Sequence, residues 1–224
     1  TEGTSENYSD IEPQFPPKRR LKVGTFKVES TGFRLGERFI KIIFDNALQR
    51  KVDEIYVTLF TDRVELLALE ELLNRWGFVF HGIKHNGKQE EKVLVKHMHT
   101  MIDGATPKLN YPNFSYSCSK FILPIMPQYH TTLLPDSQLN SENRIDFLGR
   151  EPHRYALQKV YISWASTNGA KPGDLILFYR MGVSGENKKY KSVVSTLAIV
   201  DEIIENIRSE DELLSLCQNR SVFT

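Results

Sequence analysis

Two glycines and two arginines lie close together in the segment TGFRLGERF, residues 31–39. The residues before it alternate as in a strand, and the residues after it have helical spacing. Where a strand runs into the N-terminus of a helix, backbone N–H groups point outward, and together with the helix dipole they attract phosphate oxygens. The pattern leaves two interpretations open: a turn that holds the pyrophosphate of a nucleotide-like cofactor, or a tight turn that binds nothing.

A strand and a helix are expected on either side of this turn. The segment LKVGTFKVE (21–29) alternates between two faces, and the alternation slips by one residue across Gly24-Thr25, as at a β-bulge. Residues 37–50 place apolar side chains at helical spacing with charged ones between them, which predicts an amphipathic helix. The turn would therefore join a splayed strand to a helix.

A second strand, a second helix and a hairpin follow. The segment EIYVTLF (54–60) is apolar on both faces, as a central parallel strand would be. The spacing predicts a further helix over 62–75 that ends at Gly77, and Asn86-Gly87 predicts the turn of a hairpin. A strand–helix–strand unit implies a parallel pair of strands.

These features together resemble the second half of the GCN5-related N-acetyltransferase (GNAT) fold, over residues 21–97. The resemblance rests on the bulged strand, a turn of the R/Q-G-x-G-x-G/A type, the order of the elements and a Gly-Phe pair before the hairpin. In that family the turn amides hold the pyrophosphate of acetyl-CoA, and the splayed strands enclose its pantetheine arm. The implied acetyl-CoA site consists of Val28, Glu29, Ser30, Thr31, Gly32, Arg34, Gly36 and Glu37.

Three departures from the family pattern bear on catalysis. Arg34 replaces the second glycine of the turn, and Leu73 stands where the family usually has a tyrosine that acts as general acid. The acceptor-binding first half of the family fold would need roughly 60 residues, but only 20 residues precede Leu21. An upstream domain or a partner chain would have to supply that half, and the resemblance identifies no catalytic residue.

The chain changes character after the hairpin. Residues 98–115 lack periodicity and carry a glycine and two prolines, which predicts a linker. Beyond them, KFILPIM, KVYISWAS, KPGDLILFYRM and YKSVVSTLAIV predict strands, with short helices near 153–159 and 209–218. Several strands with small helical inserts are typical of a barrel.

The second half, residues 116–224, resembles the PUA-like superfamily, in particular its ASCH and EVE branches. The resemblance rests on KVYISWAS, NGAKPGDLILFYRM and SVVSTLAIVDEI. In that superfamily a cleft beside the barrel holds a nucleotide or a modified base by stacking and by hydrogen bonds to the base edge. The candidates here are Tyr129, His130, Trp164, Asn168, Tyr179 and Arg180. Aromatic residues in apolar strands also pack in cores, so core packing stays open for each of them.

Composition narrows the classes of function. The net charge is +1, from 29 basic and 28 acidic residues, whereas a protein that holds nucleic acid through phosphate contacts is usually more basic. We therefore expect recognition in a small pocket. No apolar run approaches the ~20 residues of a membrane span, and two cysteines without a CxxC spacing suit the cytoplasm. The histidines fit no standard metal-ligand spacing, so no metal site is expected; they include His81, His85, His97 and His99.

The sequence thus predicts an α+β protein with four parts: a flexible lead-in (1–20), a partial GNAT-like α/β unit (21–97), a linker (98–115) and a PUA-like β-barrel (116–224), which looks truncated. The preferred function is an acetyl-CoA-binding N-acetyltransferase whose second domain selects an RNA or a nucleotide-bearing target. The alternative is a non-catalytic or regulatory protein that binds nucleic acid or a modified base, with the GNAT-like half as a scaffold.

Overall fold

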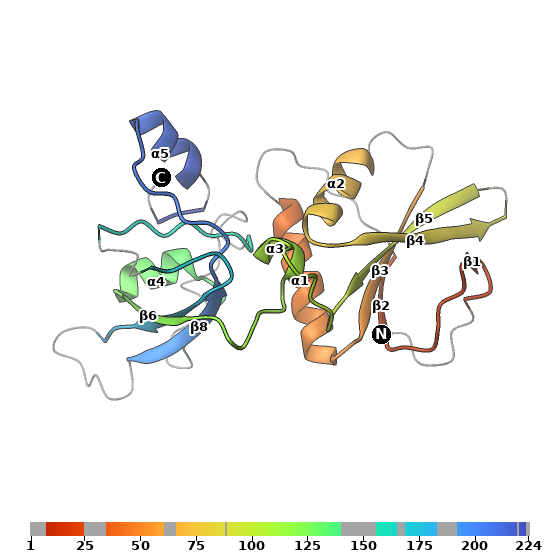
Figure 1. The fold of residues 1–224 in the computed structure, drawn as a ribbon, viewed down its shortest axis with the longest axis horizontal. Coiled ribbons are helices and arrows are strands. Elements are labelled where there is room, and N and C mark those ends of the chain that lie inside the picture. The colour runs from red at the N-terminus through yellow and green to blue at the C-terminus, as the bar shows by residue number, and fades with distance from the viewer. Residues whose placement is uncertain are drawn as a thin grey trace. The chain divides into compact units, whose positions relative to one another are not determined.

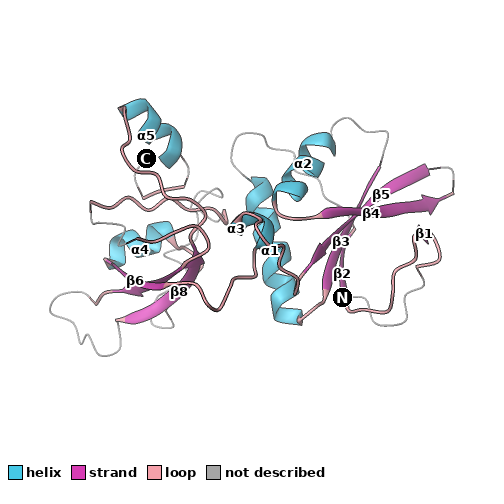
Figure 2. Cartoon of the chain, viewed as in Figure 1, coloured by secondary structure: helices cyan, strands magenta, loops and turns pink. Residues whose placement is uncertain are grey.

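The computed structural model describes residues 8–24, 35–60, 66–87, 89–139, 156–164, 169–182, 192–218 and 220–222, and it confirms the α+β class (Figures 1 and 2). The described helices are α1 (Leu35–Arg50), α2 (Leu67–Arg75), α3 (Pro107–Asn110), α4 (Pro127–Leu133) and α5 (Glu210–Cys217). The described strands are β1 (Ile11–Glu12), β2 (Arg20–Val23), β3 (Glu54–Phe60), β4 (Val79–Asn86), β5 (Gln89–His97), β6 (Lys120–Ile125), β7 (Leu175–Arg180) and β8 (Val193–Ile199).

Five strands of the first half form one sheet in the order β1-β4-β5-β3-β2. Strands β2 and β3 are parallel, with Arg20 opposite Glu54, and α1 connects them. The remaining neighbours are antiparallel, and the β4–β5 hairpin turns at Gly87, whose φ is +64°. The predicted order of strand, helix, strand, helix and hairpin is confirmed, and so is the parallel pair.

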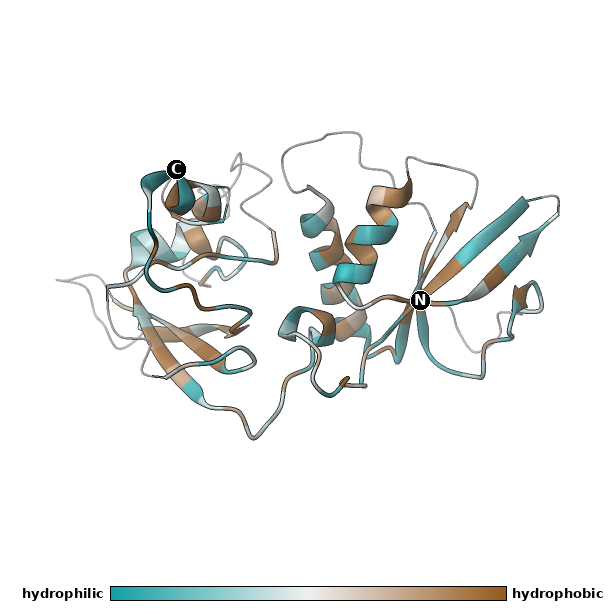
Figure 3. Ribbon diagram, turned by 45° about the horizontal axis from the view of Figure 1, so that its top comes forward, coloured by the Kyte–Doolittle hydropathy of each residue, from teal (hydrophilic) through white to brown (hydrophobic). Residues whose placement is uncertain are grey.

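Helix α1 packs its apolar stripe against one face of this sheet. Ile40, Ile43, Phe44 and Ala47 are buried, while Asp45 is exposed between them. Figure 3 shows the resulting alternation of hydrophobic and hydrophilic residues along α1 and α2. A helix with one apolar stripe is stable when that stripe is buried, so the spacing read from the sequence is the cause of the packing.

The opposite face of the sheet is covered by the N-terminal segment, which the sequence predicts as part of a flexible lead-in. Strand β1 pairs with β4, placing Ile11 opposite Lys84. Ile11 and Phe15 are buried against Tyr56 and the β5 valines. From residue 8 the segment is therefore part of the fold. Two isolated apolar side chains and a short strand pairing produce this order, and neither leaves a periodic pattern in the sequence.

Residues 98–113 of the predicted linker (98–115) pack on the first unit. The side chain of Asn110 accepts a hydrogen bond from the backbone N–H of Ile102 at 2.8 Å and donates one to its carbonyl at 3.0 Å. Lys96 Nζ donates to the Leu109 carbonyl at 2.6 Å, and the Tyr111 ring meets Phe44 edge-on. This segment is held in place by side chains that form hydrogen bonds to backbone groups. Of the described residues, 8–24 and 39–113 belong to one compact unit, whereas 35–38 belong with those from 114 onward to the other.

The second unit contains a three-stranded sheet in the order β6-β7-β8, with β6 and β7 parallel and β8 antiparallel to β7. Helix α4 follows β6 directly, and Ile125, Leu133, Leu134 and Phe178 form a buried cluster between helix and sheet. Within the described residues this sheet is open, and it does not close into the expected barrel.

Two local expectations in the second unit differ from the structure. Residues 156–159, expected in a helix, are not helical, and the described part of KVYISWAS forms no strand. Its backbone instead meets the C-terminal segment, because the Val160 N–H donates to the Arg220 carbonyl at 2.9 Å. The predicted helix over 209–218 is confirmed as α5, with the Ser209 side chain accepting from the Glu212 N–H at its start.

Gly77 offers a direct test of how tightly α2, β5 and α3 approach one another. It ends α2 with a φ of +79°, and a Cβ at this position would lie 2.2 Å from the Leu109 carbonyl oxygen and 2.6 Å from Lys96 Nζ. We predict that Gly77→Ala lowers the free energy of unfolding in urea by about 3 kcal/mol, from backbone strain and overpacking together.

Gly87→Ala is the matched control. Gly87 also has a positive φ, +64°, but a Cβ there would meet nothing within 4 Å. This control is expected to lose only about 1 kcal/mol, from the backbone alone. Equal losses in the two variants would contradict the close approach of α3 to Gly77.

Candidate functional site

The residues predicted to bind acetyl-CoA fall mostly outside the described part of the chain. Val28, Glu29, Ser30, Thr31, Gly32 and Arg34 all lie there. Gly36 and Glu37 are described, and both lie in the first turn of α1. Because α1 connects two parallel strands, it runs back along the sheet, and its N-terminus lies at the edge where β2 ends. The Glu37 carboxylate is an anion in the same turn, so it would compete with a bound phosphate for the helix dipole.

The position at which the resemblance places a general acid belongs to the core. Leu73 lies in α2 and is completely buried. A leucine has no proton to donate, and its side chain here does not reach the surface. The position in α2 at which the family has its tyrosine is thus occupied by a buried apolar side chain.

The five described candidates for nucleotide binding do not line one common pocket. His130 lies in α4 but faces the sheet: its side chain is buried, and its Nε2 lies 2.7 Å from Ser195 Oγ on β8. The pairing of β8 with β7 shifts register between Phe178 and Tyr179, and Ser195 Oγ donates to the Phe178 carbonyl at 3.4 Å. His130 therefore anchors α4 to an irregular point of β8.

The other candidates are dispersed. Arg180 is buried on β7 opposite Ile125, and Tyr179, the residue before it, points to the other face of the strand and is partly exposed. Trp164 is fully exposed, so it is not a core residue. Asn168 lies outside the described residues. Of the five described candidates, Tyr129 alone lines the pocket described next.

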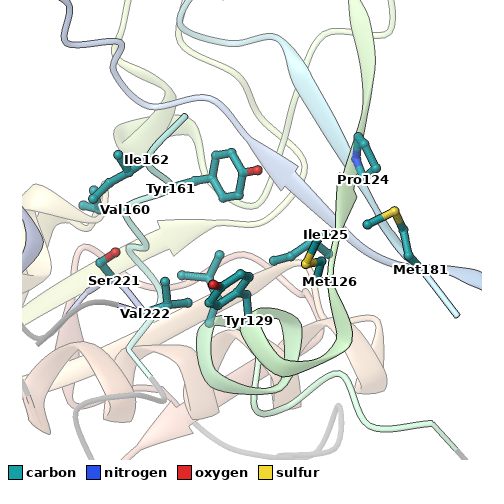
Figure 4. A pocket seen from close by; sticks show the side chains of 11 residues that line it. Pro124, Ile125, Met126, Tyr129, Val160, Tyr161, Ile162, Met181, Ser221 and Val222 are labelled. Atoms are coloured by element: carbon teal, nitrogen blue, oxygen red, sulfur yellow. The ribbon is translucent and has the colours of Figure 1, made fainter. Parts of the chain in front are cut away.

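This pocket, with a volume of about 280 Å³, lies in the second unit (Figure 4). Tyr129 of α4 and Tyr161 of the extended segment 156–164 both line it, and each is 42% exposed. The Tyr161 ring meets Phe178 of the buried cluster edge-on, with 6.2 Å between the centroids. The remaining lining residues carry no charge; they are Pro124, Ile125, Met126, Leu133, Val160, Ile162, Met181, Ser221 and Val222.

Sequence reasoning missed most of this pocket. Alternation along KVYISWAS placed Tyr161 on the face opposite Trp164, and that signal alone could have made Tyr161 a candidate. No sequence pattern marked Ser221 and Val222 as pocket residues, because they reach the pocket only through the fold of the C-terminal segment. The Ser221 N–H donates to the Cys217 carbonyl at 3.2 Å, which turns the chain back after α5.

A cluster of charged side chains lies in the first unit, at the start of β3. Glu54 receives Arg20 Nε at 2.8 Å, Lys18 Nζ at 2.5 Å and His97 Nδ1 at 3.0 Å. Burial by itself raises the pKa of Glu54, but the hydrogen bond from Lys18 and the three neighbouring positive groups outweigh it, so the pKa lies below its ordinary value. The cluster joins β2, β3 and β5, and its carboxylate is saturated by its own chain.

Lys96 of β5 is a buried lysine with a strongly lowered pKa. Burial lowers it from 10.5 to about 8, and the ammonium group has the Leu109 carbonyl as its partner. A lysine with a lowered pKa can serve as a nucleophile or base. Lys96, however, is buried beneath α3, and its ammonium group is held by the Leu109 carbonyl.

Two further kinds of site find no support in the described residues. No group of three histidine, cysteine, aspartate or glutamate side chains gathers there as a metal-binding cluster. No helix among them combines the length and the apolar character needed to cross a membrane.

Comparisons of the chain with family models, with curated proteins and with solved structures find no match. The resemblances seen in the sequence therefore remain predictions, and function has to be argued from the geometry.

The pKa of Lys96 predicts a pH dependence of stability. Between pH 8 and pH 10 the unfolded chain keeps the Lys96 proton, because an ordinary lysine has a pKa of 10.5, whereas the folded chain loses it near pH 8. The unfolded state then binds more protons, so the free energy of unfolding rises with pH, here by about 2 kcal/mol.

Urea unfolding of wild type and Lys96→Met at pH 8 and pH 10 measures this effect, and the variant should lack the rise. The range stops at pH 10 because burial and Asp45 raise the pKa of Tyr111 from 10.0 to about 12, which gives a contribution of the opposite sign above pH 10. Equal pH slopes in the two proteins would contradict the lowered pKa.

Proposed function

We propose that the second unit binds a nucleobase, or a similar neutral planar ring, in the pocket between Tyr129 and Tyr161. The observation that carries this proposal is the partial solvent exposure of the two tyrosine rings. A ring that packs in a core is buried, whereas a ring that stacks on a ligand needs an open face. Both tyrosines are 42% exposed at the wall of an apolar hollow of about 280 Å³, and they come from separate segments.

The lining also supports an uncharged ligand. None of its eleven residues is charged, and a charged group would lose its hydration there without gaining a partner. A phosphate attached to the ring would have to remain outside the pocket. This agrees with a chain whose net charge is only +1, because stacking and edge contacts to a single-stranded base need few cations.

The first unit suggests a second candidate function, the binding of acetyl-CoA. A parallel β2–β3 pair with α1 between them places a helix N-terminus at the edge where β2 ends, and such an N-terminus favours a pyrophosphate. In this scheme the chain is an N-acetyltransferase whose second unit selects an RNA or a nucleotide-bearing target. If the first unit is instead a scaffold, the pocket alone carries the function. The two schemes differ in one property, the affinity for CoA.

The base-binding proposal predicts the effect of Tyr161→Ala. Stacking of one base on an aromatic side chain is worth about 1–3 kcal/mol, so the variant should bind short single-stranded RNAs and nucleosides roughly 5- to 150-fold more weakly. Calorimetric titration measures this affinity, with folding checked by circular dichroism. Tyr116→Ala is the control, because Tyr116 is 86% exposed and does not line the pocket. An unchanged affinity in folded Tyr161→Ala would rule the pocket out as the base site, and a loss in Trp164→Ala would move the site to that exposed ring.

The acetyl-CoA proposal predicts heat of binding when CoA is titrated into the intact chain. Gly36→Trp should abolish it, because a large side chain in the first turn of α1 would occupy the place of the pyrophosphate. Gly104→Trp serves as the control, since a Cβ at Gly104 would meet nothing within 4 Å and its φ of +72° adds only a local backbone cost. The absence of heat at millimolar CoA would remove the enzymatic scheme and leave the first unit as a scaffold.

A further inference from the structure

One polar atom in the pocket lacks a partner. Ser221 is 6% exposed and lines the pocket, and its Oγ is shielded from solvent without a hydrogen bond to any described residue. A buried hydroxyl left unpaired costs free energy, and native structures rarely contain one without a reason. The Ser221 hydroxyl therefore requires an explanation that the folded chain by itself does not give.

The backbone holds Ser221 in place. The N–H groups of Arg220 and Ser221 both donate to the Cys217 carbonyl, at 2.9 and 3.2 Å. The Arg220 carbonyl accepts from the Val160 N–H at 2.9 Å, which ties the turn to the segment that carries Tyr161. On the other side, Val222 packs against the buried cluster of the sheet. The backbone of Ser221 is thus fixed by its neighbours in the chain, while its hydroxyl can still rotate about the Cα–Cβ bond.

Ser221 differs from the other lining residues in its chemistry. Figure 4 shows Ser221 beside Val160 and Val222, on the side of the hollow opposite Pro124 and Met181. The tyrosine rings offer faces for stacking, and the aliphatic and methionine side chains offer apolar contact. A serine hydroxyl can donate one hydrogen bond and accept others. It is therefore suited to read a polar atom at the edge of a ring that the tyrosines hold by its face.

We propose that Ser221 is the specificity-determining residue of this pocket, and that the ligand is a neutral ring with a hydrogen-bonding group on the edge that faces the C-terminal segment. This inference rests on the proposed base-binding function. A site built to hydrogen-bond one group discriminates strongly against an analogue that lacks it, because the buried partner is then left unpaired. Apolar contacts alone cannot discriminate in this way.

The test compares nucleosides that differ only at the base edge. Adenosine is paired with purine riboside, and cytidine with 2-pyrimidinone riboside, each analogue lacking the exocyclic group. In calorimetric titrations the wild type should prefer one parent nucleoside over its analogue by about tenfold. Ser221→Ala should reduce that preference to near unity by weakening the parent alone, and Ser117→Ala, an exposed serine outside the pocket, should keep it.

A measurement without ligand tests the same inference independently. If the hydroxyl is unpaired in the free protein, Ser221→Ala should leave the urea midpoint of unfolding unchanged or raise it. A lowered midpoint would show that the hydroxyl has a structural partner, and it would overturn the inference. An unchanged preference in Ser221→Ala, with binding still lost in Tyr161→Ala, would overturn the role of Ser221 and leave the base site standing. If no nucleoside binds to the wild type, the proposed function and this inference both fall.

Discussion

The first unit depends on one buried carboxylate. Glu54 opens β3, the strand that pairs in parallel with β2 and antiparallel with β5, and it is the shared partner of Arg20, Lys18 and His97. The Arg20 guanidinium is inaccessible to solvent and lies 4.1 Å from the centre of the Phe15 ring. An uncompensated buried charge costs roughly 3–5 kcal/mol. Glu54 therefore ties three strands together and also makes it possible for the N-terminal segment to close over an arginine.

The second unit is held together differently. Its hydrophobic cluster is small, and polar contacts define how the connecting segments lie on the sheet. His130 meets Ser195, and Ser137 meets the neighbouring Thr196, so two consecutive residues of β8 fix α4 and the residues after it. Asp174 accepts from the N–H groups of Ser119 and Lys171, each at 2.8 Å, which sets the start of β7.

The sequence predicted elements whose residues repeat with a regular period. The apolar stripe of α1, the β-branched run of β3 and the positive-φ glycines at positions 77 and 87 all appear where the pattern placed them. Segments held by single contacts were not predictable in the same way. Phe15 packs against several side chains, Asn110 bonds to the backbone of Ile102, and Ser221 lines a pocket. None of these contacts leaves a periodic pattern in the sequence. For the same reason the sequence predicted only part of the pocket. Tyr129 was a candidate because of its residue type, whereas the other lining residues come together only when distant segments of the chain meet.

The C-terminal wall of the pocket has a thermodynamic consequence. Ser221 and Val222 reach the pocket only while the turn after α5 keeps its bonds to Cys217 and Val160. Docking of this segment and occupancy of the pocket are therefore linked equilibria, and each must stabilise the other by the same free energy. A ligand held by the tyrosines would also slow the release of the last turn. Conversely, any change in α5 that favours the undocked segment would lower the affinity of the pocket for a ligand, although α5 does not contact that ligand.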